Sequence, residues 1–331
     1  MVNNIEINDR KFYHSFPRVR KEVSKEEVIK CGLEILKSIR DIGLILAPEI
    51  IDWNQPTIEG RDREIKIKQV RISFTELSSS EINKHSEKFG SFAIEFNIDA
   101  LRKLGAVPVI YLPQHLKDDN NFSAIGSIIV AELNDIKYTI NQLHNLSQFS
   151  KPENLLKLLP DVKVVSEDCV IKMQNTNEKN EIGHSYEVPI KNINDILSYI
   201  GYRNSPFDLM IGSLTFVQNL LCKTDDDKHD SLLEYYGQRE WRLLPGIVKG
   251  GKSQTRSLTD FEKKNLINID SNFWNKQLTF EKNCCTRVDD ALVIETFEDK
   301  HISELISSVI VPQEAFEQAK LMFGDKVRCL E

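Results

Sequence analysis

The spacing of apolar residues predicts one well-defined helix near the start of the chain. Apolar side chains recur at helical spacing over residues 28–42, and Gly43 follows as a stop signal. Ser24 and Glu27 have the spacing of a capping box, in which two side chains satisfy backbone N–H groups at the helix start. After Gly43, residues 44–46 lead into what reads as a polar loop through Trp53.

Alternation with a period of two predicts a strand over residues 69–76, because successive side chains of a strand point to opposite faces. One face carries Val70, Ile72 and Phe74, and the other carries Arg71, Ser73 and Thr75. Other strands are expected at residues 13–17, 91–96, 107–112, 235–242, 291–297 and 307–311, and other helices at residues 78–90, 97–105, 123–146, 152–159, 193–200 and 312–324.

These elements predict an α+β protein with one mixed sheet. Strand-like segments lie on both sides of a mostly helical stretch, so the chain reads as a single domain, residues 1–331, with a helical insertion at about residues 115–225. Residues 174–185 are polar and read as a flexible loop or a hairpin tip.

Charge and composition narrow the functional classes. The 331-residue chain has a net charge of −7, which argues against broad, non-specific binding of nucleic acid. Residues 61–71 and 249–256 form local basic patches, which are typical of solvated faces. The chain has no basic and apolar leader, no run of apolar residues long enough to cross a membrane, and dispersed cysteines, so we expect a cytoplasmic protein with reduced thiols.

The segment from Tyr235 to Arg242 concentrates chemistry in eight residues. As a strand it places Tyr236, Gln238, Glu240 and Arg242 on one face. An amide and a carboxylate two residues apart suit a site that holds a ribose, and a half-buried strand whose charges pair with their neighbours is the alternative interpretation. Phosphate-loop, dinucleotide-binding, nucleophile-elbow and zinc-protease motifs are missing, and no metal site is expected.

Three polar strand segments occur in a fixed order: His14-Ser15-Phe16, Ser73-Phe74-Thr75 and Gln238-Arg239-Glu240. This order resembles that of NAD-dependent ADP-ribosyltransferases, although the middle segment departs from the Ser-Thr-Ser pattern. Over most of its length the chain also resembles the bacterial abortive-infection AbiGi family. Five segments carry that resemblance: Tyr13–Phe16, Ile72–Glu76, Lys88–Ile94, Gly105–Tyr111 and Arg239–Arg242.

The transferase resemblance implies NAD as the substrate and a sheet core like that of the ADP-ribosyltransferases. Glu240 would hold the nicotinamide ribose and stabilise the developing positive charge, and Gln238 would orient the acceptor. The remaining implied residues bind NAD. His14 would contact the adenosine ribose, and Ser15 belongs to the same cofactor-binding set. Ser73 or Thr75 would support Glu240 and the nicotinamide ribose, Phe74, Phe89 or Tyr236 would stack on nicotinamide, and Arg18 or Arg242 would pair with the diphosphate.

Three functions remain open for this sequence. The first is a phage-defence effector that transfers ADP-ribose to a protein or nucleic-acid acceptor. The second is a non-catalytic antitoxin or phage-sensing subunit that uses an aromatic groove to bind a protein or a nucleotide. An acidic surface and the long helical insertion suit a protein partner, such as a toxin, an antitoxin or a phage trigger protein. The third is a nucleic-acid-processing or RNA-binding protein, which only the two basic patches favour.

Overall fold

The computed structural model describes residues 11–18, 23–56, 62–112, 128–133, 135, 136, 139, 170–176, 182–189, 192, 195, 217–219, 239–245, 255–280 and 283–330. The chain forms two compact units. The first contains residues 1–118 and 215–331, and the second contains residues 119–214. Each unit is described by itself.

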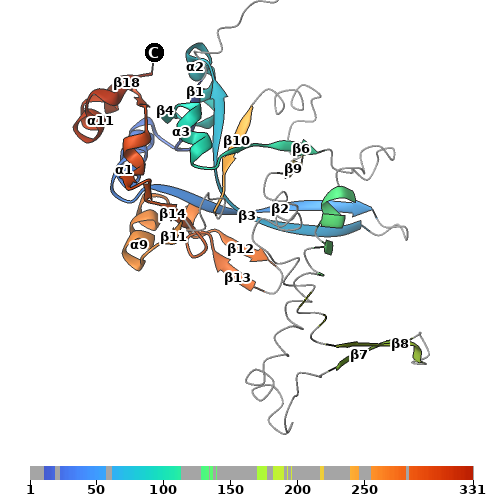
Figure 1. Cartoon of the computed structure of the whole chain (residues 1–331). Coiled ribbons are helices and arrows are strands. Elements are labelled where there is room, and N and C mark those ends of the chain that lie inside the picture. Colours follow the sequence, from blue (N-terminus) through green and yellow to red (C-terminus); the bar gives the residue numbers. More distant parts are fainter. Residues whose placement is uncertain are drawn as a thin grey trace, which may run out of the picture. The chain divides into compact units, whose positions relative to one another are not determined.

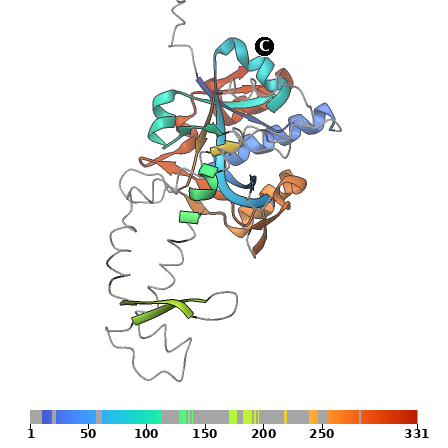
Figure 2. The ribbon, with the colours of Figure 1, turned by 90° about the vertical axis from the view of Figure 1, so that its right-hand side faces the viewer.

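The first unit contains both strands and helices, with several strands following one another directly along the chain (Figures 1 and 2). Its strands are β1 (Lys11–Phe16), β2 (Leu44–Pro56), β3 (Asp62–Leu77), β4 (Phe92–Phe96), β5 (Val107–Pro108), β6 (Ile110–Leu112), β9 (Val217–Asn219), β10 (Glu240–Leu243), β11 (Arg256–Ser257), β12 (Gln277–Phe280), β13 (Asn283–Thr286), β14 (Leu292–Ile294), β15 (Thr296–Phe297), β16 (Lys300–His301), β17 (Ser308–Val311) and β18 (Val327–Cys329). Its helices are α1 (Lys25–Asp41), α2 (Ile82–Phe89), α3 (Ile98–Lys103), α9 (Asp260–Ile269), α10 (Ser271–Trp274) and α11 (Phe316–Phe323), with short 3₁₀ turns at Ser79–Glu81, Ile302–Leu305, Gln313–Ala315 and Gly324–Lys326.

Strand β3 is the centre of the main sheet. In the described residues this sheet has ten strands, with the order β11-β14-β2-β3-β1-β4-β17-β18. Off this path, β10 pairs with β3, and β5 pairs with β10. Most pairs are antiparallel, and β17 and β18 are parallel, so the predicted mixed sheet is confirmed. Different parts of β3 pair with β2, β10 and β1.

Helix α1 forms as the sequence predicts. Ser24 accepts a hydrogen bond from the backbone N–H of Glu27, the Glu27 carboxylate accepts one from Ser24, and the capping box is complete. Leu36 and Ile39 are buried against the sheet. Gly43 ends the helix with a φ of +125°, and a Cβ there would lie 2.3 Å from the carbonyl oxygen of Ile294. The helix and α11 lie side by side in Figures 1 and 2.

Most predicted elements that fall within the described residues are present, and three predictions are wrong. The helix predicted at 152–159 and most of those predicted at 123–146 and 193–200 lie outside the described residues. Residues 44–56 form the long strand β2 instead of leading into a loop, because they pair with β3 and bury Trp53 completely. The predicted strands at 107–112 and 291–297 are each broken into two short strands. The sequence also gave no expectation for α9, which begins with a capping box formed by Thr259 and Glu262.

In the second unit, residues 128–133 are helical, and β7 (Val170–Thr176) pairs antiparallel with β8 (Ile182–Pro189). The sequence did not decide between a flexible loop and a hairpin tip for residues 174–185, and this pairing supports the hairpin. Among the residues that the structure describes, none of the helices is both long and apolar enough to cross a membrane.

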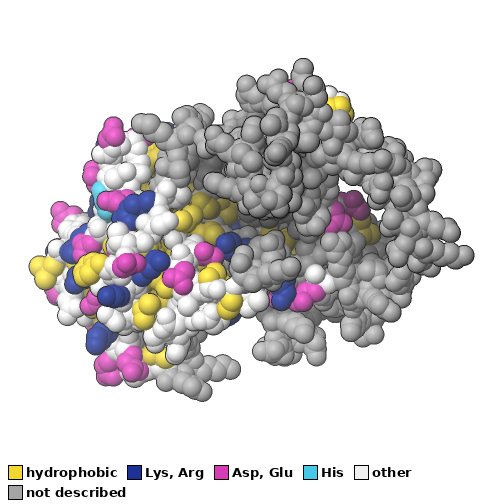
Figure 3. Space-filling model, turned by 90° about the horizontal axis from the view of Figure 1, so that it is seen from below, with side chains coloured by type: hydrophobic (Ala, Val, Ile, Leu, Met, Phe, Trp, Pro, Cys, Tyr) yellow, Lys and Arg dark blue, Asp and Glu magenta, His cyan; other side chains and the backbone are white. Residues whose placement is uncertain are grey.

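Basic and acidic side chains are intermixed on the described part of the face drawn in Figure 3. The basic residues 62–71 belong to the β2–β3 ribbon, where Lys66 lies near Glu64 and Lys68 pairs with Asp290. This pairing agrees with a solvated, charge-balanced face. Of the second basic patch, only residues 255 and 256 lie within the described chain, and Arg256 pairs with Glu262 and Glu295.

Candidate functional site

Strand pairing brings the three polar segments of the sequence together. Glu240 of β10 lies opposite Thr75 of β3, and Arg242 lies opposite Ser73. The Ser73 hydroxyl donates a hydrogen bond of 2.7 Å to Oε1 of Glu240. On β1, Nδ1 of His14 lies 2.8 Å from the carbonyl oxygen of Ser73. The early, middle and late segments therefore meet at Ser73.

Both carboxylate oxygens of Glu240 are occupied. Oε1 accepts from Ser73 and, at 2.9 Å, from Nε of Arg242, while Oε2 accepts from the hydroxyl of Tyr111 at 2.8 Å. Burial would raise the pKa of Glu240, but the attraction of Arg242 and the hydrogen bond from Ser73 outweigh it and hold the pKa below its usual value. Glu240 is therefore a fixed anion that neutralises Arg242, whose side chain is 1% exposed.

A chain of polar contacts continues from Arg242 along the same face of the sheet. Arg242 donates to Oε1 of Gln69 at 3.0 Å, and Arg71 donates to the same oxygen at 2.6 Å. Arg71 also pairs with Glu49 at 2.6 Å, and Glu49 pairs with Arg18 at 3.1 Å. Gln69 is completely buried, so its amide oxygen links two guanidinium groups away from water.

Glu49 joins three cations at the end of this network. Burial opposes its ionisation, but Arg71, Arg18 and Arg287 together hold the pKa of Glu49 below its usual value. Burial lowers the pKa of Arg71, and the nearby Arg242 and Arg18 lower it further against the opposing effect of Glu49. The carboxylates thus offset the cost of keeping charged guanidinium groups away from water.

His14 is neutral at physiological pH. Burial lowers its pKa to about 4, against the hydrogen bond to the Ser73 carbonyl, and Arg18 lowers it further. Because a carbonyl oxygen can only accept, Nδ1 of His14 carries the proton and Nε2 keeps its lone pair. Within the described chain, Nδ1 has a hydrogen-bond partner and Nε2 does not.

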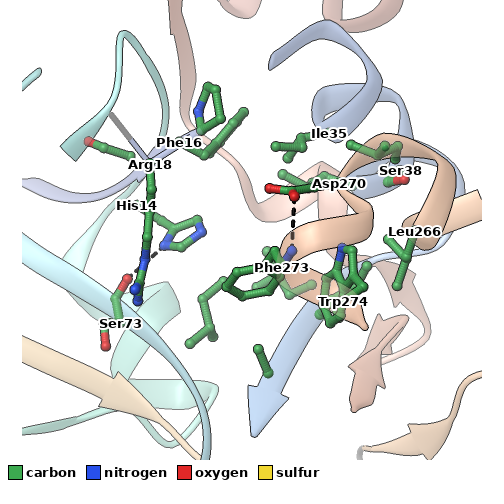
Figure 4. Close-up of a pocket in the computed structure, with 18 of the residues that line it drawn as sticks. His14, Phe16, Arg18, Ile35, Ser38, Ser73, Leu266, Asp270, Phe273 and Trp274 are labelled. Atoms are coloured by element: carbon green, nitrogen blue, oxygen red, sulfur yellow. Dashed lines mark hydrogen bonds between the residues drawn. The ribbon is translucent and has the colours of Figure 1, made fainter. Parts of the chain in front are cut away.

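A pocket of about 230 Å³ lies beside this network, where β1 and β2 end their pairing with β3. Figure 4 shows His14 and Arg18 on one side of it and Phe273 and Trp274 on the other. Helix α1 contributes Ile35, Ser38 and Ile39, and α9 and α10 contribute Leu266, Ile269, Asp270, Phe273 and Trp274. The guanidinium of Arg287 packs on the Phe273 ring at 4.1 Å and donates to the backbone carbonyls of Pro48 and Phe273.

The structure places the predicted site residues in different surroundings. His14, Ser15, Arg18 and Ser73 line the pocket, whereas Glu240 and Arg242 belong to the ion-pair network. The Ser15 hydroxyl is buried without a hydrogen-bond partner among the described residues.

The aromatic candidates lie apart from the pocket. The Phe74 ring is fully buried between Phe96 and His14, and Phe89 stacks on His85 of its own helix at 4.4 Å. Thr75 lies opposite both Tyr13 and Glu240 in the strand pairing. The predicted residues Tyr236 and Gln238 lie outside the described residues.

Sequence reasoning missed the residues that complete this site. They are Glu49, Gln69, Tyr111, Phe273 and Arg287. Glu49 was hidden in the segment that reads as a loop. The Thr259–Glu262 capping box was the one local signal that could have revealed α9 and, after it, Phe273. In the part of the chain that is described, the structure has no group of three histidine, cysteine, aspartate or glutamate residues that could hold a metal ion.

The fold and this network define a mixed α/β protein in which a chain of buried ion pairs borders a small pocket. The chain matches the family described as "putative abortive phage resistance protein AbiGi, antitoxin" over residues 61–282, two thirds of its length, and it belongs to that family. The match covers β3, β10, α9 and most of the pocket wall that follows β2. No curated protein and no solved structure matches the chain, so the transferase-like part of the predicted fold stays a prediction.

Proposed function

We propose that this protein is the antitoxin of a phage-defence toxin–antitoxin pair and that it acts by binding its partner rather than by catalysis. Membership of the AbiGi family supplies the antitoxin role and a toxin as the partner. The observation that carries the non-catalytic part is the state of Glu240. Its two oxygens accept hydrogen bonds from Ser73, Tyr111 and Arg242, so the carboxylate is used in contacts that stabilise the fold.

The dimensions of the pocket support the same proposal. Sites for ligands of drug size or larger usually measure roughly 300–1,000 Å³. At about 230 Å³ the pocket is smaller than this range, and Glu240 is not among its lining residues. A dinucleotide with its nicotinamide ribose at Glu240 does not fit these two features.

Transfer of ADP-ribose from NAD to a macromolecular acceptor is the second candidate. It is favoured by one specific observation, the meeting of His14, Ser73 and Glu240 through hydrogen bonds of 2.7 and 2.8 Å. Calorimetry with NAD and transfer of label from NAD to a phage-infected lysate separate the two candidates.

The test of the antitoxin proposal is growth rescue. The chain is produced together with a growth-arresting toxin encoded in the same genome, and growth is compared with that of cells producing the toxin alone. We expect wild type to restore growth and to co-purify with the toxin, without NAD turnover.

The informative variant is Glu240→Gln combined with Arg242→Met, since it removes both charges of the buried pair together. Retained rescue by this double variant supports binding without catalysis. Two results together would establish the transferase instead. The double variant would fail to rescue growth although it unfolds like wild type, and the wild-type protein would transfer label from NAD.

A further inference from the structure

The pocket beside the ion-pair network has the features of a ligand site, and the proposed antitoxin role does not use it. An engineered cavity of about 150 Å³ with apolar walls holds one benzene molecule. The pocket here is about 230 Å³, which is suitable for a bicyclic ring of the same thickness. Its size therefore sets an upper limit of about two fused rings.

The walls of the pocket are mostly apolar. They come from three directions: the end of β1 with Phe16 and the following Pro17, β2 with Leu44, Ile45 and Ala47, and the helices with Ile35, Ile39, Leu266, Ile269, Phe273 and Trp274. A bound ring would lose its contact with water on most of its surface without needing hydrogen bonds. A ring with many polar atoms would instead leave several of them unsatisfied.

Polar groups interrupt these walls, and most of them are already paired: Arg18 and Arg71 with Glu49, Ser73 with Glu240, and Asp270 with the backbone N–H of Phe273. The Ser15 hydroxyl has no partner among the described residues, but it is itself buried. The acceptor that stays open is on His14. Nδ1 of His14 is committed to the Ser73 carbonyl, so Nε2 offers a lone pair, and Figure 4 shows the His14 ring projecting into the pocket. A ligand that places one N–H there would satisfy this acceptor. At the opening, the exposed guanidinium of Arg18 lies 6.0 Å from the centre of the Phe273 ring. A cation in that position also favours an electron-rich aromatic ring, and indole is the best of these.

We propose that the pocket binds an indole-type ring, an apolar bicycle whose single N–H donates to Nε2 of His14. A purine has a similar size, but it carries several ring nitrogens and exocyclic groups, and Arg18 and Arg71 already direct donors to Glu49. The indole chemistry could be supplied by free indole or by a tryptophan side chain of another polypeptide.

The test is calorimetry of the full-length chain with indole and with benzofuran, which has the same shape and lacks the N–H. We expect indole to bind and benzofuran to bind roughly tenfold more weakly, the usual effect of one lost hydrogen bond to a buried group. Adenine is the third ligand. Tighter binding of adenine than of indole, equal binding of indole and benzofuran, or no binding of indole at millimolar concentration would each overturn the proposal.

Two variants assign the site. His14→Asn keeps an N–H for the Ser73 carbonyl, and its shorter side chain leaves no acceptor at the position of Nε2. We therefore expect indole to bind roughly tenfold more weakly while benzofuran is unaffected. His85→Gln is the matched control outside the pocket and should bind as wild type. Ala47→Phe fills the pocket and should abolish binding, and unchanged binding in that variant would exclude this pocket as the site.

N-acetyl-tryptophanamide distinguishes the two sources of the ring. Binding comparable to that of indole indicates a tryptophan side chain of a partner, and binding of indole alone indicates a free small molecule. Because none of these measurements uses the toxin or NAD, the failure of this proposal and the failure of the proposed function are distinguishable.

Discussion

Removal of the negative charge of Glu240 should destabilise the protein, whatever its effect on function. The Arg242 side chain is 1% exposed, so in Glu240→Gln its guanidinium would remain buried with Gln69 as its described neutral partner. Breaking a buried ion pair by removing one partner costs roughly 3–5 kcal/mol. Glu240 itself is 14% exposed, and water can partly replace it, so we expect a loss of about 3 kcal/mol.

This loss is a large part of the total, since domains are stable by only roughly 5–15 kcal/mol. For a unit of this size, each kcal/mol shifts the melting temperature by about 2–4 °C, so the expected decrease is about 6–12 °C. Urea unfolding followed by circular dichroism measures the free energy directly, and thermal unfolding gives the second value.

Two controls separate the buried pair from a general effect of charge. Arg18→Gln breaks a pair whose arginine is 72% exposed, and it should change stability by less than about 1 kcal/mol. Glu240→Gln with Arg242→Met removes both charges and should recover most of the lost stability. The reasoning is refuted if Glu240→Gln unfolds within about 1 kcal/mol of wild type, or if the double variant is no more stable than the single one.

The remaining predictions concern pH, packing and capping. His14 and His85 each have a pKa of about 4 in the folded protein, against 6.5 in the unfolded chain. Between these two values the unfolded chain binds more protons than the folded protein does. The free energy of unfolding should therefore fall as the pH decreases from 6.5 towards 4, by up to about 1.4 kcal/mol per pH unit for each histidine. Urea unfolding at pH 7.5, 6.5 and 5.5 should show a smaller decrease in His14→Asn than in wild type, and parallel decreases would contradict this. Gly32→Ala should lower stability by about 1–3 kcal/mol despite the better helix propensity of alanine, because its Cβ would lie 2.3 Å from the ring of the buried Phe92; a higher melting temperature would disprove the packing argument. Thr259→Ala should lower the free energy of unfolding by about 0.5–2 kcal/mol, because α9 loses its N-cap. The same urea titration measures this change, and an unchanged free energy would show that the hydroxyl does not stabilise the helix.

The sequence by itself determined the elements whose information is local. The capping box and the apolar spacing predicted α1, and strict alternation predicted the two faces of β3. The strand period alone therefore placed the side chains of Ser73 and Phe74 on opposite faces of the sheet. The same alternation placed Glu240 and Arg242 on one face of β10, where they form an ion pair across two residues. The alternative that these charges pair with neighbouring strands agrees with what the structure shows.

Only the tertiary structure decided how those elements meet. Residues 47–53 read as a polar loop, and they form a strand because their backbone groups pair with β3, a contact that no local pattern encodes. Glu49 enters the site through that pairing, and Tyr111 reaches Glu240 from 129 positions away. The neutrality of His14 likewise depends on its burial and on the carbonyl of Ser73, because a pKa is set by surroundings and not by residue type. The pocket is the clearest case, since helix α9 closes it from a segment more than 200 residues beyond β1, and long-range packing of this kind leaves no periodic signal in the sequence.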